Sequence, residues 1–364
     1  MKNIIAFLIF ILPAYLYAQP SPSRKTAVIA YFMGNAAEAK KYPLDKLTHI
    51  IYSFTRLDGD TIAFHYPNQD KDFRDLIALK KQYANLRVMV SLGGWGGCEP
   101  CSPQFAKPAT RAAFAASVKR FMERYGADGL DLDWEYPGIP GHPGHPWMRE
   151  DVENFTALVA NLRSVMGGRY ELSFAAGGFG KALDSSINWK AVMPLVDRVN
   201  LMTYDLTNGY SKVTGHHTPL HISGEQKDGT DRCVDYLLTL GIPSEKIVIG
   251  AAFYARVWKD VPATGNGLYQ PGVFKSMVNY KDFDREFSTA NGFKVFWDEE
   301  CMAPWSYSAV TKEFATYDDK QSMRAKVTYL KSKKLGGIMF WELGGDTYRN
   351  GLLDEIARTL ETGK

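Results

Sequence analysis

The chain has 364 residues, of which 45% are hydrophobic and 13% aromatic, and its 43 basic and 40 acidic side chains leave a formal net charge of +3. Such a balanced charge argues against nucleic-acid binding and against a polybasic surface that docks on membranes. The length suits either two ordinary domains or one large barrel.

The N-terminal segment has the pattern of a secretory signal peptide. Lys2 precedes an apolar run over residues 4–16, and Ala18 supplies a small residue at the end. We expect cleavage after Ala18 of the signal peptide 1–18, so that a secreted or periplasmic protein remains. The apolar run is short for a membrane span and no later stretch qualifies, so no stable membrane span is expected. Residues 19–25 indicate a flexible leader into one domain, residues 26–364.

Short apolar or β-branched runs then alternate with amphipathic stretches along the chain. The runs number eight, at residues 26–33, 49–55, 87–94, 128–134, 170–177, 198–205, 246–255 and 336–343. Helical periodicity marks residues 70–84, 109–125, 149–166, 231–240, 320–333 and 351–360. Repeated strand–helix alternation favours a parallel sheet, and eight units predict an α/β fold of the closed (β/α)8 TIM barrel type.

One segment interrupts this alternation. Gly, Pro, Asn and aromatic residues dominate residues 259–313, which also contain strand-like runs at 293–297 and 303–307. We interpret the segment as a short insertion between the seventh strand and the seventh helix of the barrel.

Three acids alternate with apolar residues at the end of the fourth predicted strand. Successive strand residues point to opposite faces, so Asp131, Asp133 and Glu135 share one face. Like charges held close together inside a protein are costly, and their coupling raises the pKa of the outermost acid. A calcium loop is a poor alternative because its ligands lie in a Gly-rich turn rather than beside Leu132 and Trp134. The pattern therefore favours an acid–base enzyme with Glu135 as general acid.

Polar and aromatic residues also mark the ends of the other predicted strands. In a barrel of this type, functional residues lie at the C-terminal ends of the strands. The candidates at these ends are Tyr31, Phe54, Gly93, Gly94, Trp95, Tyr136, Met202, Tyr204, Asp205, Tyr254, Arg256 and Trp341. Several of the aromatic residues could equally be core, and Gly ends many strands without any functional role.

The acidic pattern resembles the DxxDxDxE signature of family 18 glycoside hydrolases, the chitinases and their relatives. Asp128, Asp131, Asp133 and Glu135 occupy its four acidic positions. Ser91-Leu92-Gly93-Gly94 resembles the SxGG motif of the same family, and the segments 202–205, 254–256 and 341–342 match further motifs in the expected order. The resemblance covers residues 26 to about 343.

This resemblance implies retaining hydrolysis of β-1,4-linked N-acetylglucosamine polymers by substrate-assisted catalysis. Glu135 would protonate the glycosidic oxygen while the 2-acetamido carbonyl of the substrate attacks the anomeric carbon, giving an oxazolinium ion. Asp133 would hold the acetamido N–H, turning between Asp131 and the substrate. Tyr204 would orient the acetamido oxygen, and Asp205 would bind the sugar.

The resemblance also assigns substrate contacts. Trp341 takes the position of the tryptophan under the sugar at subsite −1, where an indole face stacks on a pyranose. Gly93 and Gly94 would let the loop backbone approach the sugar. The insertion 259–313 would form part of one groove wall, and its short length predicts a shallow, open cleft.

Two other functions are compatible with the same motifs. One is an endo-β-N-acetylglucosaminidase acting on N-glycan cores, which shares the catalytic residues and differs in its loops. The other is a non-catalytic chitin-binding lectin, although such proteins typically lose the acid at the position of Glu135. We expect chitin or N-acetylglucosamine oligosaccharides as the partner, no nucleic acid, no cofactor or metal, and a monomer.

Cysteines and histidines complete the candidates. Cys98 and Cys101 lie in a Gly-rich loop where a disulfide is favoured over free thiols, whereas a pairing of Cys233 with Cys301 stays open. These cysteines lack the spacing of a zinc site. The histidines in two loop segments lack metal-binding spacing, and we expect them on surface loops, some at the groove rim: His142, His145, His216, His217 and His221.

Overall fold

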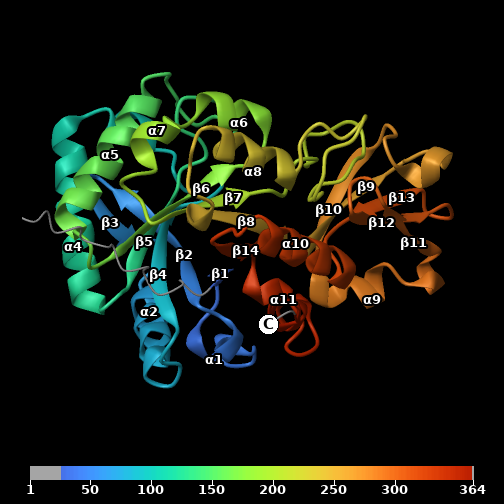
Figure 1. Cartoon of the computed structure of the whole chain (residues 1–364), viewed down its shortest axis with the longest axis horizontal. Coiled ribbons are helices and arrows are strands. Elements are labelled where there is room, and N and C mark those ends of the chain that lie inside the picture. The colour runs from blue at the N-terminus through green and yellow to red at the C-terminus, as the bar shows by residue number, and fades with distance from the viewer. Residues whose placement is uncertain (1–25, 363–364) are drawn as a thin grey trace, which may run out of the picture.

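The computed structural model describes residues 26–362 and contains the predicted closed barrel (Figure 1). Its eight parallel strands are β1 (Ala27–Phe32), β2 (His49–Asp58), β4 (Arg87–Gly93), β5 (Gly129–Asp133), β6 (Glu171–Gly177), β7 (Arg198–Met202), β8 (Ile247–Ala252) and β14 (Gly337–Trp341). Strand β1 pairs with both β14 and β2, which closes the cylinder. The predicted signal peptide and leader, residues 1–25, lie outside the described residues.

Helices connect the strands around the outside of the barrel. They are α1 (Ala36–Ala39), α2 (Asn68–Ala78), α3 (Cys101–Phe105), α4 (Pro108–Tyr125), α5 (Asp151–Met166), α6 (Gly180–Ser185), α7 (Trp189–Val192), α8 (Thr230–Thr239), α10 (Lys320–Ser332) and α11 (Leu352–Glu361). Short 3₁₀ helices lie at Leu44–Lys46, Leu79–Lys81, Ser244–Lys246, Thr264–Gly267, Tyr280–Asp282, Thr289–Asn291 and Leu343–Gly345. All six predicted helices are confirmed, and the additional helices are too short to show a helical period. None of the described helices is both long and apolar enough to cross a membrane.

Two further structures lie outside the barrel pattern. Strand β3 (Thr61–Phe64) forms an antiparallel hairpin with β2, which the sequence did not indicate. A separate antiparallel sheet in the order β10-β9-β13-β12-β11 stands beside the barrel, on the right of Figure 1. Its elements are β9 (Tyr254–Lys259), β10 (Val273–Asn279), α9 (Phe283–Glu286), β11 (Phe293–Asp298), β12 (Ala303–Ser308) and β13 (Glu313–Thr316). The sheet thus starts before and ends after the predicted 259–313.

Alternation along the barrel strands separates two cores. In β1, Val28 and Phe32 belong to the large cluster that packs against the surrounding helices. Ile29 and Tyr31 belong to a smaller cluster with residues from β2, β4, β7, β8 and β14. This smaller cluster lies inside the barrel, because residues two apart share one face of a strand. Side chains placed inward near the C-terminal strand ends therefore meet at one end of the barrel.

Candidate active site

Asp131 lies on β5 at the centre of the site and is completely buried. Its carboxylate accepts hydrogen bonds from Tyr31 Oη at 2.9 Å, Ser91 Oγ at 3.0 Å, Ser173 Oγ at 2.6 Å and Asn200 Nδ2 at 3.1 Å. Burial raises the pKa of Asp131 above its usual value, and these hydrogen bonds counteract only part of that increase. Asp131 is therefore a rigid acceptor held from four other strands.

Asp133 follows two residues later, on the same face, and has a contrasting environment. Its Oδ1 is buried without a hydrogen-bond partner among the described residues. Burial raises the pKa of Asp133 well above its usual value, and the charges of Glu135 and Asp131 raise it further. A buried acceptor without a donor is costly, so this oxygen suits a donor that arrives with a ligand.

Glu135 lies just beyond the end of β5 and is only half-buried. Its pKa is raised to about 7, chiefly because burial disfavours the charged form and also because Asp205 repels it, although a hydrogen bond to Tyr136 lowers it. A carboxyl group with this pKa holds a proton near neutral pH and can deliver it to a leaving group. The signature residue Asp128 lies at the opposite end of β5, where it accepts from Val88 N at 2.7 Å and binds Lys80 Nζ at 2.7 Å. Asp128 therefore stabilises the N-terminal end of β5 and does not contribute to the site directly.

Aromatic side chains lie beside these acids. Trp341, at the end of β14, stacks on Phe54 with ring centroids 5.5 Å apart and an angle of 15° between the rings. Tyr31 lies on another side, 6.0 Å from the same indole. Burial, with the nearby charge of Asp133, keeps the pKa of Tyr204 well above its usual value, so its hydroxyl stays protonated. The site thus combines an aromatic platform with a phenolic donor.

Gly93 and Gly94 have a structural role within the fold, beside the approach to the sugar that we expect of them. Both have positive φ angles, 107° and 79°. A Cβ at Gly93 would lie 2.3 Å from the carbonyl oxygen of Asp133, and one at Gly94 would lie 2.4 Å from the Phe54 ring. Gly94 N also donates to that same carbonyl at 2.8 Å. Glycine here lets the end of β4 pack against β5 and so fixes the backbone of Asp133.

A charged network forms another side of the site. Arg256 on β9 donates to both carboxylate oxygens of Asp205, at 2.6 Å each, and His217 Nδ1 lies 3.5 Å from Asp205 Oδ1. Burial alone would raise the pKa of Asp205, but His217 and Arg256 lower it far below its usual value. Asp205 is therefore a permanent anion, unlike the acids of β5. Tyr254 lies beside this pair, with the Arg256 guanidinium 5.6 Å from its ring.

Other predicted residues lie around these acids. Tyr136 packs edge-on against Phe179, and Met202 belongs to the inner barrel cluster. The Trp95 side chain is 48% exposed and lies near two further rings, His142 at 5.3 Å and Tyr210 at 6.4 Å. Trp95 is thus the exposed member of the predicted set.

Sequence reasoning missed several residues that build the site. Ser173 and Asn200 hold Asp131, and their polar side chains inside apolar strand runs were a usable signal. Tyr210, which is 63% exposed beside Trp95, gave no such signal. His217 was expected on a surface loop, and so was His216; both expectations are wrong, because both side chains are completely buried. They are covered by the antiparallel sheet, whose packing on this loop the sequence pattern does not reveal.

The structure confirms the predicted disulfide and shows the state of the other two cysteines. Cys98, in the loop that follows β4, forms a disulfide with Cys101, the first residue of α3. Cys233 and Cys301 are both buried free thiols, so the pairing left open does not occur.

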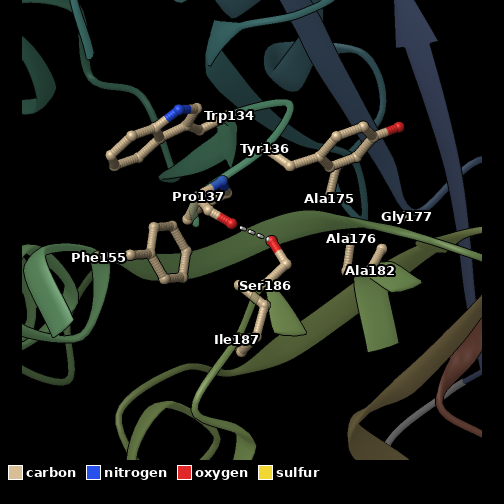
Figure 2. Close-up of a pocket in the computed structure, with 10 residues that line it drawn as sticks. All are labelled: Trp134, Tyr136, Pro137, Phe155, Ala175, Ala176, Gly177, Ala182, Ser186 and Ile187. Carbon is tan, nitrogen blue, oxygen red and sulfur yellow. Dashed lines mark hydrogen bonds between the residues drawn. The ribbon is translucent and has the colours of Figure 1, made fainter. Parts of the chain in front are cut away.

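A small cavity lies behind the segment that carries Glu135, and Figure 2 shows its lining. Tyr136, Pro137, Phe155 and Ser186 are among the lining residues, and Ser186 Oγ donates to Pro137 O at 2.7 Å. Its volume of about 10 Å³ is far too small for a sugar ring. The cavity is a packing gap, and the hydrogen bond beside it ties the segment after Glu135 to the end of α6.

Comparisons with known proteins agree with this geometry. The model for "Glycosyl hydrolases family 18" matches residues 27–346. Chitinase A1 of Niallia circulans is 33% identical over 80% of this chain and 45% of that protein. Chitinase B of Serratia marcescens is 29% identical over 92% of this chain and 79% of that protein. The chain thus spans less than half the length of the first of these relatives.

Solved structures resemble the whole described fold. Chitinase ChiA74 from Bacillus thuringiensis superposes with a TM-score of 0.86 at 27% identity, covering 92% of this chain and 69% of that one. A family 18 N-acetylglucosaminidase from Paenibacillus barengoltzii gives a TM-score of 0.82 at 34% identity, covering 92% of this chain and 99% of that one. With the family model over most of the chain and the acids of β5 gathered at the C-terminal end of the barrel, this chain belongs to glycosyl hydrolase family 18.

Proposed function

We propose that the protein is a secreted, retaining chitinase that hydrolyses β-1,4-linked N-acetylglucosamine polymers with the help of the substrate's own acetamido group. The observation that carries the proposal is the contrast along β5. Asp131 has four donors, Asp133 has a buried oxygen without one, and Glu135 has a pKa of about 7.

Glu135 acts as the general acid in this proposal. Its proton passes to the glycosidic oxygen as the bond to the anomeric carbon breaks. The carbonyl oxygen of the 2-acetamido group forms the new bond to that carbon, which gives an oxazolinium ion. Glu135, now a carboxylate, removes a proton from the water that opens this ion, and two inversions give net retention.

Asp133 and Tyr204 position the acetamido group. The free oxygen of Asp133 accepts the acetamido N–H, which supplies the missing donor and places negative charge beside the cationic intermediate. Tyr204 keeps its proton because burial raises its pKa, and it donates to the acetamido oxygen. The Asp131 carboxylate already accepts four hydrogen bonds, so it stays fixed at the end of this row of acids that lies deepest in the barrel.

The remaining residues bind the sugar. Trp341, held against Phe54, offers its indole face to the pyranose at the cleavage point. Asp205, Arg256 and the nearby Tyr254 bind sugar hydroxyl groups from the side of the antiparallel sheet. Trp95, Tyr136 and Met202 extend the contacts, and the sheet forms part of a groove wall. An Ostrinia furnacalis Group IV chitinase at 26% identity has been solved in complex with allosamidin, which supports carbohydrate binding in general.

Product analysis by mass spectrometry tests the proposed identity of the substrate. The protein is incubated with chitin hexamer and, separately, with a high-mannose glycoprotein; we expect short oligomers from the hexamer only. Released glycan alone would instead indicate the endo-β-N-acetylglucosaminidase. N-acetylglucosamine as the sole product from the start would indicate an N-acetylglucosaminidase, the activity named for the Paenibacillus relative. Sugar binding without any product would indicate a lectin.

Two variants test the mechanism in the same assay. Glu135→Gln should bind chitin hexamer and lose activity by about 10²–10⁴-fold or more, because the proton donor is absent; near-normal turnover would contradict the role of Glu135. Asp133→Asn should fail chiefly on substrates with the 2-acetamido group. Wild-type rates on chitin oligomers would show that the acetamido group does not participate.

A further inference from the structure

A second cluster of chemically active side chains lies away from the acids of β5, where the antiparallel sheet meets the barrel. It contains His216 from the loop after β7, Asp298 at the end of β11, and Cys301 from the connection between β11 and β12. One donor atom from each residue lies within 4.8 Å of the others. His216 and Cys301 are completely buried, whereas the Asp298 side chain is 17% exposed.

The backbone holds these donors in place. Asp298 Oδ1 accepts the backbone N–H groups of Glu300 at 2.9 Å and Cys301 at 3.0 Å, so Oδ2 is left to face His216 Nε2 at 3.0 Å. The carbonyl oxygen of Cys301 accepts from Leu220 N at 3.0 Å. The connection between β11 and β12 is therefore fastened to the loop that carries His216.

Within the described residues, His216 Nδ1 has no hydrogen-bond partner although it is buried. A neutral ring carries one proton, and with that proton on Nδ1 the lone pair of Nε2 faces Asp298 Oδ2. Two acceptors facing each other at 3.0 Å then need a cation between or beside them. A proton on Nε2 meets this need in the hydrogen-bonded form, and a metal ion bound to both atoms is the alternative.

We propose that His216, Asp298 and Cys301 form a site for a single Zn²⁺ ion. Imidazole nitrogen, carboxylate oxygen and thiolate sulfur are the three ligand types of protein zinc sites. With metal–ligand bonds of about 2.0–2.3 Å, tetrahedral donors stand roughly 3.3–3.6 Å apart, so closing the cluster takes movements of about 1 Å. Cys301 loses its thiol proton to water when it binds. The fourth ligand is water entering beside Asp298, or the hydroxyl of Tyr269, which lies 3.9 Å from Cys301 Sγ.

The ion would join two parts of the fold that are 82 residues apart in sequence. This distance is why spacing along the chain gave no zinc pattern. The neighbouring His217 lies 3.5 Å from Asp205 in the candidate active site. Zn²⁺ at His216 would therefore stabilise the loop that supports Asp205, as well as the attachment of the sheet that supplies Arg256.

The test uses the untagged, chelator-treated full chain. Zn²⁺ is added, free ion is removed by gel filtration, and bound metal is measured by mass spectrometry; Cd²⁺ serves as an optical probe because a Cd–thiolate bond absorbs in the ultraviolet. We expect about one equivalent of Zn²⁺, a higher thermal midpoint with Zn²⁺ and a Cd–thiolate band. Cys301→Ser should fold normally, remove the band and weaken Zn²⁺ binding by about tenfold or more. Asp298→Asn should weaken binding and leave the thiol in place.

Cys233→Ser is the matched control, because Cys233 is the other buried free thiol, donates to Gly178 O and does not belong to the cluster. It should keep both the band and the bound zinc. Bound zinc without a thiolate band would place the ion on surface histidines such as His142 and His145, whose rings are 4.5 Å apart. That result, no stoichiometric binding, or a band that survives Cys301→Ser would overturn the proposal.

Discussion

At the scale of single residues, the site uses acids of the same type in opposite protonation states. Burial raises the pKa values of Glu135 and Asp133; the charge of Asp205 raises the first further, and the charges of Glu135 and Asp131 raise the second. Asp205 has a lowered pKa because Arg256 binds it with two hydrogen bonds and His217 lies beside it. A proton donor and a permanent anion therefore stand close together, and each state follows from the neighbouring charges.

The pH dependence of activity should report this coupling. Glu135 must hold its proton to act as an acid, so kcat/KM should fall as the pH rises through about 7. Asp205 repels the charged form of Glu135 and so raises its pKa. In Asp205→Asn that repulsion disappears, and Arg256 is left with an uncompensated positive charge. The alkaline limb should move to lower pH by about 1 unit or less.

The measurement is a pH profile of kcat/KM on chitin oligomers for both proteins. Because Asp133 and Glu135 titrate together, the pH at which kcat/KM falls reports an apparent pKa of the pair and not of one residue. Glu123→Gln removes an exposed carboxylate on α4, away from the site, and should leave the limb unchanged. An alkaline limb that stays in place or moves upward in Asp205→Asn would contradict the assigned repulsion.

At the scale of elements, the sequence supported the barrel well and the inserted sheet poorly. Each barrel strand lies in a short apolar or β-branched run, and six of the eight runs are followed by a helical period, so eight strands and six helices could be placed. The row of acids followed directly from the two-residue period of β5. Short elements such as α6, α7 and β3 carry too few residues for a period to show.

Contacts between distant segments were the part that sequence could not supply. The loop with His216 and His217 contains Gly, Thr and Pro, which is typical of an exposed loop. It is buried because the antiparallel sheet packs over it and places Asp298 and Thr316 beside its histidines. Local composition describes what a segment can do alone, whereas burial here depends on a partner that follows it by more than 80 residues.

Helix α10 offers a test of local stabilisation at this scale. Asp319 at its N-cap accepts from Ser322 N at 2.8 Å, and Ser322 Oγ accepts from Asp319 N at 2.9 Å. This capping box satisfies two backbone donors. Asp319→Ala should lower the free energy of unfolding by about 1 kcal/mol, whereas Asp319→Asn keeps an acceptor and should lose less.

Urea denaturation of both variants checks this expectation. Glu123→Ala, on the exposed face of α4, provides a control that also removes a carboxylate. Equal losses for Asp319→Ala and Asp319→Asn would show that charge, rather than the capping hydrogen bond, determines the effect.

At the scale of the whole molecule, the two ends of the barrel have different roles. The C-terminal strand ends carry the acids and aromatic residues of the site. The N-terminal ends carry a buried ionic cluster in which Glu171 on β6 contacts Arg198 at 2.7 Å, Arg87 at 2.7 Å and His49 at 3.2 Å. These residues begin four different strands, so the cluster joins one side of the barrel at its base. We assign it to stability, as is usual for this end of the fold.

Substitution of Glu171 should therefore affect folding more than catalysis. Glu171→Gln leaves the buried Arg198 without its counter-charge and should cost about 3–5 kcal/mol of unfolding free energy near neutral pH. The folded protein that remains should keep its kcat on chitin oligomers, since the cluster lies at the far end of β6 from the site. Glu123→Gln, with the same change of charge at the surface, should be nearly neutral.

The pH dependence of this loss has a definite sign. Burial alone would raise the pKa of Glu171, but His49, Arg198 and Arg87 lower it overall, so the folded state binds the proton less readily than the unfolded chain. The stabilisation is complete above the unfolded value of about 4.3 and is lost as the pH falls toward the folded value. Urea denaturation at pH 7 and at about pH 3 should therefore show a smaller difference between wild type and Glu171→Gln in acid. A difference that stays constant between the two pH values would mean that the carboxylate charge does not stabilise the barrel, and that the variant is weakened by altered packing instead.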